Sequence, residues 1–172
     1  MDGLFFEKTQ IELNKNLQTQ IKQKISKAKN FLEIEKEYAK NYNSVIIEKL
    51  CKILLKKANK QYIDALKKLK KDTEELVKNL KIITKYNFLE FTEEEIFVFF
   101  NNRYENFMQH AFEYIKDLCN IAQESGYLCV INAVEYTVEL FENQITTFLD
   151  KEIQNLEKIV KEQTNNGGEK LC

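Results

Sequence analysis

The chain has 172 residues, a formal net charge of −1, no proline and only four glycines. A β-sheet protein of this length needs turn residues at every chain reversal, so their near absence between residues 4 and 166 argues against a sheet-rich fold and predicts a few long helices. The absence of an apolar run of transmembrane length predicts a soluble protein, and the lack of a signal peptide predicts a cytoplasmic one, with peripheral attachment to a membrane left open.

The first helix is predicted to begin near residue 10, because Thr9-Gln-Ile-Glu12 has the spacing of a capping box. From Ile34 to Tyr62 the apolar positions then advance almost entirely by four residues. Each step of four overshoots a helical turn by about 40°, so this series would wind most of the way round a straight helix. Either the helix breaks between residues 40 and 60, or its contact surface changes along its length. We favour a break near residues 56–60.

The second helix shows the three-and-four spacing of a buried stripe from Tyr62 to Ile83. Residues 85–91 are expected to form an apolar connector. Thr92-Glu-Glu-Glu95 is the clearest helix start in the chain, because a capping box coincides with three acids that the helix dipole favours. Heptad-spaced apolar runs follow on both sides of Ser125-Gly126, where we expect the chain to reverse, with a continuous helix as the alternative.

Together these elements predict an all-α fold. We expect an elongated antiparallel bundle of three or four long amphipathic helices with coiled-coil-like packing. The bundle should occupy residues 1–164 as a single domain, and residues 165–172 should form a flexible C-terminal tail.

Charge is divided unevenly along the chain. Residues 1–86 hold 20 lysines and 11 acids, a balance of +9, whereas residues 87–172 hold six basic residues and 16 acids, a balance of −10. Six lysines that recur by three, four or seven would lie on one face of a continuous helix. These are Lys49, Lys52, Lys56, Lys60, Lys67 and Lys71. We expect this face either to be solvated or to bind an anionic membrane.

Nucleic acid is the weaker partner for these lysines. Arginine occurs only at Arg103, and Tyr62 is the only aromatic residue among the lysines, whereas proteins that hold single strands interleave aromatic and basic side chains. We therefore do not expect nucleic acid to bind.

One helical turn, Ile96 to Phe100, is apolar on every side. A helix of that kind needs a cover on its outer side as well as a core on its inner side. We expect a second copy of the chain to supply this cover, with Phe97, Phe99 and Phe100 at the dimer contact.

No arrangement of catalytic residues is predicted. His110 is the only histidine and lies about 180° around its helix from Cys119, so the two cannot form a dyad there; pairing with Cys51 or Cys129 is left open. One histidine cannot supply the two Glu-x-x-His pairs of a di-iron bundle, and no glycine-rich phosphate loop occurs. The four cysteines, which include Cys172, are expected to be reduced thiols. We expect no catalytic residues, no metal, no cofactor and no small-molecule substrate.

The segment Ile34-Glu-Lys-Glu-Tyr-Ala-Lys40, preceded by Phe5-Phe6-Glu7, resembles the FCH segment that opens F-BAR domains of the BAR superfamily. The resemblance covers residues 5–50. It departs from the family at Asn30, Phe31 and Leu32, where the family usually has a basic and acidic pair, and the chain is shorter than a usual F-BAR module. The resemblance implies an antiparallel homodimer of three-helix units whose basic face lies on an anionic membrane.

We therefore expect a non-enzymatic, BAR-like helical module that binds anionic phospholipid membranes through the lysine face as a dimer. The alternative is a coiled-coil adaptor or scaffold that binds another protein through the acidic C-terminal half.

Overall fold

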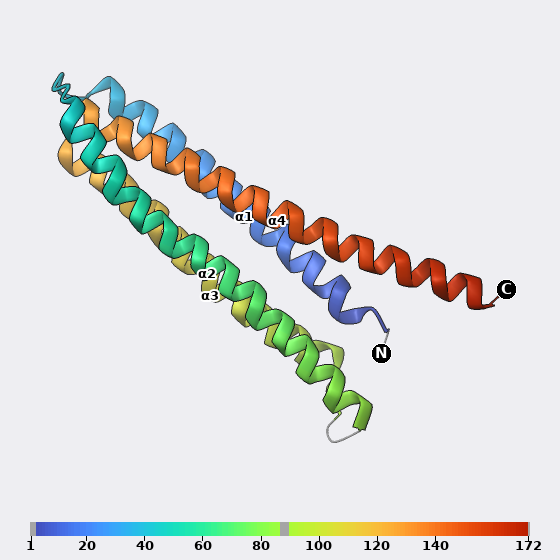
Figure 1. The fold of residues 1–172 in the computed structure, drawn as a ribbon. Helices are drawn as coiled ribbons and strands as arrows, with labels where there is room; N and C mark the ends of the chain where they lie inside the picture. Colours follow the sequence, from blue (N-terminus) through green and yellow to red (C-terminus); the bar gives the residue numbers. More distant parts are fainter. Residues whose placement is uncertain (1–2, 87–89, 172) are drawn as a thin grey trace.

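The computed structural model describes residues 3–86 and 90–171, with side chains described up to residue 165. It contains four α-helices, which are α1 (Phe5–Glu37), α2 (Val45–Tyr86), α3 (Glu93–Ser125) and α4 (Leu128–Leu171). The helices run side by side in one elongated bundle (Figure 1), and the described residues form no strand. The prediction of an all-α bundle of long helices is confirmed, with four helices in place of the three-helix unit that the resemblance implies.

The acid-rich helices α3 and α4 lie between the lysine-rich helices α1 and α2. Helices α3 and α4 contact each other and form the middle of the bundle, while α1 and α2 each pack against both of them and barely touch one another. One ion pair joins α1 to α2, between Lys81 and the buried carboxylate of Glu7 at 2.9 Å. Each lysine-rich helix therefore lies against acid-rich helices, so the opposite charges of the two halves of the sequence attract each other within the fold.

Side-chain pairs give the direction of each helix relative to α4. Lys36 pairs with Glu135, Lys29 with Glu142 and Lys15 with Glu157, so α1 runs antiparallel to α4. Asn59 pairs with Gln144 and Lys70 with Glu152, so α2 runs parallel to α4. Consecutive helices run in opposite directions, which places the α1–α2 and α3–α4 turns at the same end of the bundle (Figure 1).

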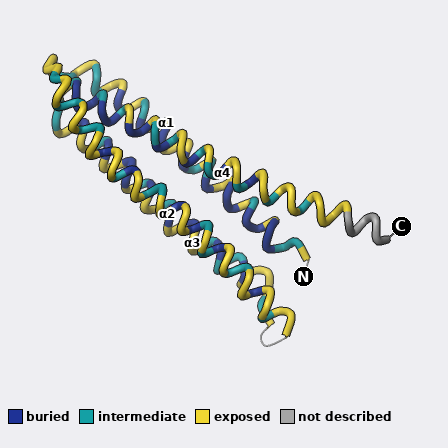
Figure 2. The backbone as a smooth tube through the Cα atoms, viewed as in Figure 1, coloured by how far each residue is buried: buried dark blue, intermediate teal, exposed yellow. Residues whose placement is uncertain are grey.

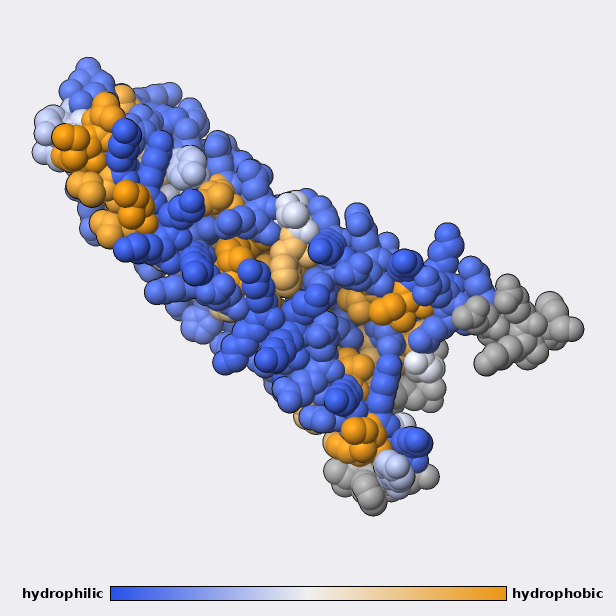
Figure 3. Space-filling model, viewed as in Figure 1, coloured by the Kyte–Doolittle hydropathy of each residue, from blue (hydrophilic) through white to orange (hydrophobic). Residues whose placement is uncertain are grey.

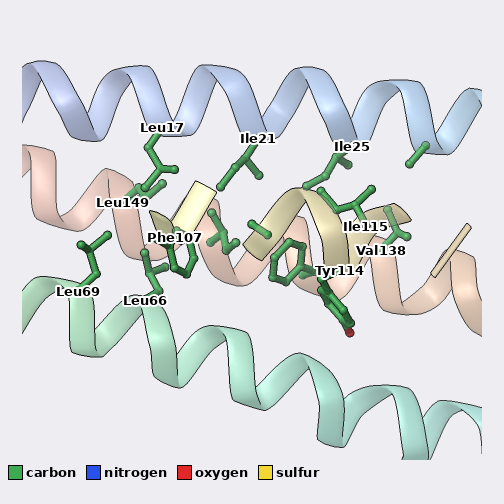
Figure 4. Close-up of a cluster of buried hydrophobic side chains, with 14 of the residues drawn as sticks. Leu17, Ile21, Ile25, Leu66, Leu69, Phe107, Tyr114, Ile115, Val138 and Leu149 are labelled. Atoms are coloured by element: carbon green, nitrogen blue, oxygen red, sulfur yellow. The ribbon is translucent and has the colours of Figure 1, made fainter. Parts of the chain in front are cut away.

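The core runs along the inward sides of the helices (Figure 2). In its middle, Leu17 and Ile21 of α1, Leu66 of α2, Phe107 of α3 and Leu149 of α4 point into a shared cluster (Figure 4). Leu17, Ile21, Leu66 and Leu149 are each only 1% exposed. Side chains of this kind contribute about 1.5–3 kcal/mol each when they are buried, so the burial of apolar side chains from all four helices stabilises the bundle.

The first helix begins earlier than expected. It starts at Phe5, and Thr9 is buried inside the helix, so the predicted start near residue 10 is wrong. Phe6 is buried and its ring lies 6.3 Å from that of Phe100. Packing of the first turn against α3 thus keeps the residues before Thr9 helical, so the apparent capping box lies inside the helix.

The break between the first two helices falls at residues 38–44, not near residues 56–60. There Ser44 Oγ accepts a hydrogen bond of 3.2 Å from the backbone N–H of Ile47 and starts α2. The N–H of Lys40 donates to the carbonyl of Gly126 at 2.8 Å, and the N–H of Leu128 donates to the carbonyl of Lys40 at 3.2 Å. The predicted break near residues 56–60 is wrong because α2 is continuous through this segment.

Two predicted helix ends are confirmed. Thr92 Oγ1 accepts a hydrogen bond of 3.1 Å from the N–H of Glu95, as a capping box requires. The chain reverses at Gly126, whose φ of 66° lies in the left-handed region that glycine adopts without strain. Of the predicted connector, residues 85 and 86 belong to α2, and residues 87–89 lie outside the described residues. Helix α4 continues to Leu171, and the flexibility predicted for residues 165–172 stays a prediction.

Candidate functional site

The six lysines predicted to bind a membrane lie together on α2; we call Lys49, Lys52, Lys56, Lys60, Lys67 and Lys71 the lysine face. They share one side because α2 is a single continuous helix, along which they extend for about 33 Å. Lys52 is half-buried and the other five are exposed. This side is adjacent to the core side of α2 and borders α4.

Most of these lysines have no counter-ion. Lys52 pairs with Glu48 at 3.2 Å, one turn earlier on the same helix. Within the described part of the chain, the other five lysines of the face make no ion pair. The same is true of Lys57 and Lys68 beside them.

The acids of α4 do not compensate this charge. Glu135, Glu142 and Glu157 pair with lysines of α1, and Glu152 pairs with Lys70 at 2.6 Å. The hydrogen bond from Lys70 to Glu152 raises the pKa of that lysine, so Lys70 keeps its charge at neutral pH. The acids of α4 therefore pair with three lysines of α1 and with Lys70, and leave five lysines of the lysine face without a counter-ion in the described chain.

A groove of about 500 Å³ runs between α2 and α4 beside the lysine face. Asp64 is the only acid among the described residues that line it. The full lining is Ile53, Lys56, Lys57, Asn59, Lys60, Ile63, Asp64, Lys67 and Gln144. An elongated basic groove with apolar side chains in its walls can accept anionic groups attached to apolar chains.

The start of α2 carries a group of exposed apolar side chains that the sequence reasoning did not identify. We call Val45, Ile46, Leu50, Ile53 and Leu54 the apolar tip; each is between 54% and 72% exposed. Figure 3 shows apolar side chains gathered at the end of the molecule where α2 begins. Tyr38, in the preceding turn, is 81% exposed. Large apolar side chains clustered in this way mark an interaction surface more often than isolated ones do.

The sequence contained a signal for the apolar tip in the spacing by four. Along α2 the series Ile46, Leu50, Leu54, Ala58 and Tyr62 turns by about 40° at each step. It therefore starts on the solvent side, with Ile46 at 72% exposed, and reaches the core only near Tyr62. Both alternatives drawn from this series hold, since the helix breaks and the contact surface also changes along α2.

The apolar turn predicted at a dimer contact is partly covered by the chain itself. Phe100 is 0% exposed, so it has no surface to offer to a second copy. Phe97 and Phe99 are half-buried. The ring of Phe99 contacts that of Phe91 edge-on, with 5.5 Å between the ring centroids. Val98, between them, is 50% exposed. The dimer stays a prediction, and Val98 is the residue of this turn best placed for it.

His110 and the cysteines lie in different surroundings. His110 is exposed, with Nδ1 3.9 Å from a carboxylate oxygen of Glu113, and lines a groove between α2 and α3 whose described lining contains no cysteine. Burial raises the pKa of Cys51, with a further contribution from nearby Cys129, and burial alone raises the pKa of Cys119. A raised pKa disfavours the thiolate that a nucleophile requires. Cys172 lies outside the described residues.

Among the described residues no three side chains of His, Cys, Asp or Glu are placed to hold a metal ion. In that same part of the chain, no helix combines the length and the apolarity needed to cross a bilayer.

Comparisons with protein-family models, with curated proteins and with solved structures found no match. The resemblance of residues 5–50 to F-BAR domains stays a prediction.

Proposed function

We propose that the protein binds anionic membrane surfaces as a peripheral protein, through the lysine face of α2. One observation supports this most strongly: five lysines lie along one side of one helix without a counter-ion in the described chain, although the chain as a whole is almost neutral. Their mutual repulsion is relieved by a surface that carries negative charge.

A membrane suits this face better than a nucleic acid does. The ammonium group of a lysine and the headgroup of an anionic lipid attract each other as point charges. Single-stranded nucleic acid also needs free aromatic rings on which its bases stack. Tyr62 is the only aromatic residue within this stretch, and its ring is already stacked on Tyr114 with 4.2 Å between the centroids. Arg103 lies on a different helix, α3, with its guanidinium bonded to the carbonyl of Phe99.

Flotation with phosphatidylserine-rich vesicles at about 0.15 M salt tests the proposal. The unchanged protein should float with anionic vesicles and remain at the bottom with neutral ones. Charge reversal by Lys56→Glu, Lys60→Glu and Lys67→Glu should weaken the partitioning by about a hundredfold or more, since each lysine near the surface contributes about 1 kcal/mol.

The matched control reverses three lysines elsewhere. Lys22 and Lys27 on α1 and Lys116 on α3 are exposed and make no ion pair within the described chain, so their replacement by Glu gives the same net charge. This control should keep most of the binding, and both triple variants should keep the helicity of the unchanged protein. Equal loss in the two variants would show that only net charge matters and would contradict a role for this face.

Failure of the unchanged protein to float would favour the second candidate, an adaptor that binds a protein through its acidic half. The observation in its favour is the outer side of α3, where Glu105, Glu113 and Asp117 are exposed and form no ion pair with a lysine or arginine in the described chain. A basic peptide bound in the absence of vesicles would support it.

A further inference from the structure

We infer that the apolar tip inserts into the membrane, so that the α1–α2 end of the bundle enters the headgroup region while the lysine face lies on the surface. The inference rests on the proposed function, and it adds a second type of contact to the electrostatic one.

The apolar tip and the lysine face are continuous on α2. Ile46, Ile53, Lys60 and Lys67 follow one another at intervals of seven residues, so they form one row along the helix. The row changes from apolar to basic between Ile53 and Lys60. A surface that contacts this row meets apolar side chains at one end and ammonium groups along the rest.

The apolar tip does not contribute to the core of the protein. Ile46, Leu50, Ile53 and Leu54 lie within about 100° of the helix circumference, roughly opposite the buried Leu55. They therefore remain in water unless something outside the chain covers them, at a free-energy cost that rises with the exposed apolar area.

Charge identifies the cover as a lipid surface rather than a second copy of the same tip. Lys49, Lys56 and Lys57 flank the apolar residues, and Glu48 is already paired with Lys52. Two copies placed tip to tip would bring these lysines together, which like-charge repulsion disfavours. An anionic bilayer attracts the lysines and offers an apolar interior to the side chains between them.

The turn before α2 has the residues suited to the water–membrane boundary. Tyr38 and Tyr42 are 81% and 49% exposed, and tyrosine rings favour the level of the headgroups. The ring of Tyr42 lies 5.2 Å from that of Tyr127 in the neighbouring turn. Backbone hydrogen bonds between Lys40 and the α3–α4 turn hold the two turns together and thus support the end that inserts.

A single tryptophan reports the insertion directly, because the chain has none of its own. We expect Ile46→Trp to shift its emission to shorter wavelength on phosphatidylserine-rich vesicles and to be quenched when the acyl chains carry bromine. The control is Ile159→Trp, at a site 40% exposed on α4 toward the other end of the bundle, which should show neither effect.

A second variant measures what the tip contributes to binding. Ile46→Ser, Leu50→Ser and Leu54→Ser replace side chains at least 55% exposed, so the core is preserved. At about 0.5 M salt, where the lysine contribution is screened, the unchanged protein should retain partial binding and this variant should bind at least about tenfold more weakly.

The outcomes separate the inference from the proposed function. Flotation of the Ile46→Trp variant without quenching would overturn insertion and leave lysine-mediated binding intact. Absence of flotation by the unchanged protein at any salt would overturn both. A blue shift of Ile46→Trp that grows with protein concentration in the absence of vesicles would show that a second copy covers the tip, and would overturn the inference.

Discussion

The phenol of Tyr114 on α3 donates a hydrogen bond of 3.2 Å to the backbone carbonyl of Leu55 on α2. The Tyr114 ring also stacks on Tyr62 and meets Phe141 of α4 edge-on, with 5.1 Å between the latter centroids. A single side chain thus joins three helices within the length of the lysine face, and it fixes α2 against the middle pair of the bundle.

Replacing Tyr114 by Phe should lower the free energy of unfolding by about 1 kcal/mol, the usual net contribution of a buried hydrogen bond. The ring contacts are retained, so the helicity should not change. Urea denaturation followed by circular dichroism measures the effect. Tyr136→Phe is the control, because Tyr136 is 41% exposed and should be nearly neutral.

Alkaline pH should destabilise the fold through its buried tyrosines. Burial raises the pKa of Tyr104 and Tyr114 above the ordinary value of 10.0. Below this value both phenols are protonated in the folded and unfolded chain; above it the unfolded chain loses the protons first, so stability falls as the pH rises.

The urea midpoint should therefore decrease as the pH rises above about 10. The double variant Tyr104→Phe and Tyr114→Phe should show a shallower decrease over the same range. An identical pH dependence in the two proteins would mean that other groups cause it.

Replacing His110 by Ala should leave both stability and vesicle binding unchanged. The side chain is exposed, and surface substitutions of this kind usually change the free energy of unfolding by less than about 0.5 kcal/mol. Thermal denaturation and flotation measure the two properties. Loss of binding with an intact fold would instead indicate that the groove between α2 and α3 takes part.

Oligomeric state should depend on Val98 if the predicted dimer forms through the apolar turn. Val98→Glu adds a charge at a half-exposed site, so it should convert a dimer into a folded monomer. Phe99→Glu is a less selective test, because Phe99 also packs on Phe91 within the chain. Light scattering coupled to size exclusion measures the mass; a monomer already in the unchanged protein would refute this contact.

The sequence predicted one helix start correctly and another incorrectly from the same pattern. Thr92 and Glu95 form a real cap because Glu90 and Phe91, directly before Thr92, are not helical. Thr9 and Glu12 have the same spacing, but Phe6 and Phe100 pack together and draw the preceding residues into the helix. Local capping rules cannot include a contact between residues so far apart in the sequence.

The position of the first break was missed for a related reason. Asparagine has a low helix propensity, yet the amide of Asn59 donates to Gln144 Oε1 at 2.5 Å inside the α2–α4 contact. The hydrogen bond to Gln144 offsets this low helix propensity, and no local sequence pattern could indicate it. The common side of the lysine face follows from spacing along one continuous helix, whereas the predicted break near residues 56–60 would have divided it; the continuity of α2 is what brings the six lysines together.

The pairing of α1 with α4 also affects the order in which the chain can fold during synthesis. Helix α1 is synthesised before α3 and α4, the two helices that it contacts most. Its three ion pairs to Glu135, Glu142 and Glu157 cannot form until α4 has been synthesised. The apolar side of α1, including Leu17 and Ile25, is covered only in part by α3 until then. A nascent chain stalled after Ser125 should therefore remain open to chaperones and proteases, and the native bundle should form only once α4 has left the ribosome.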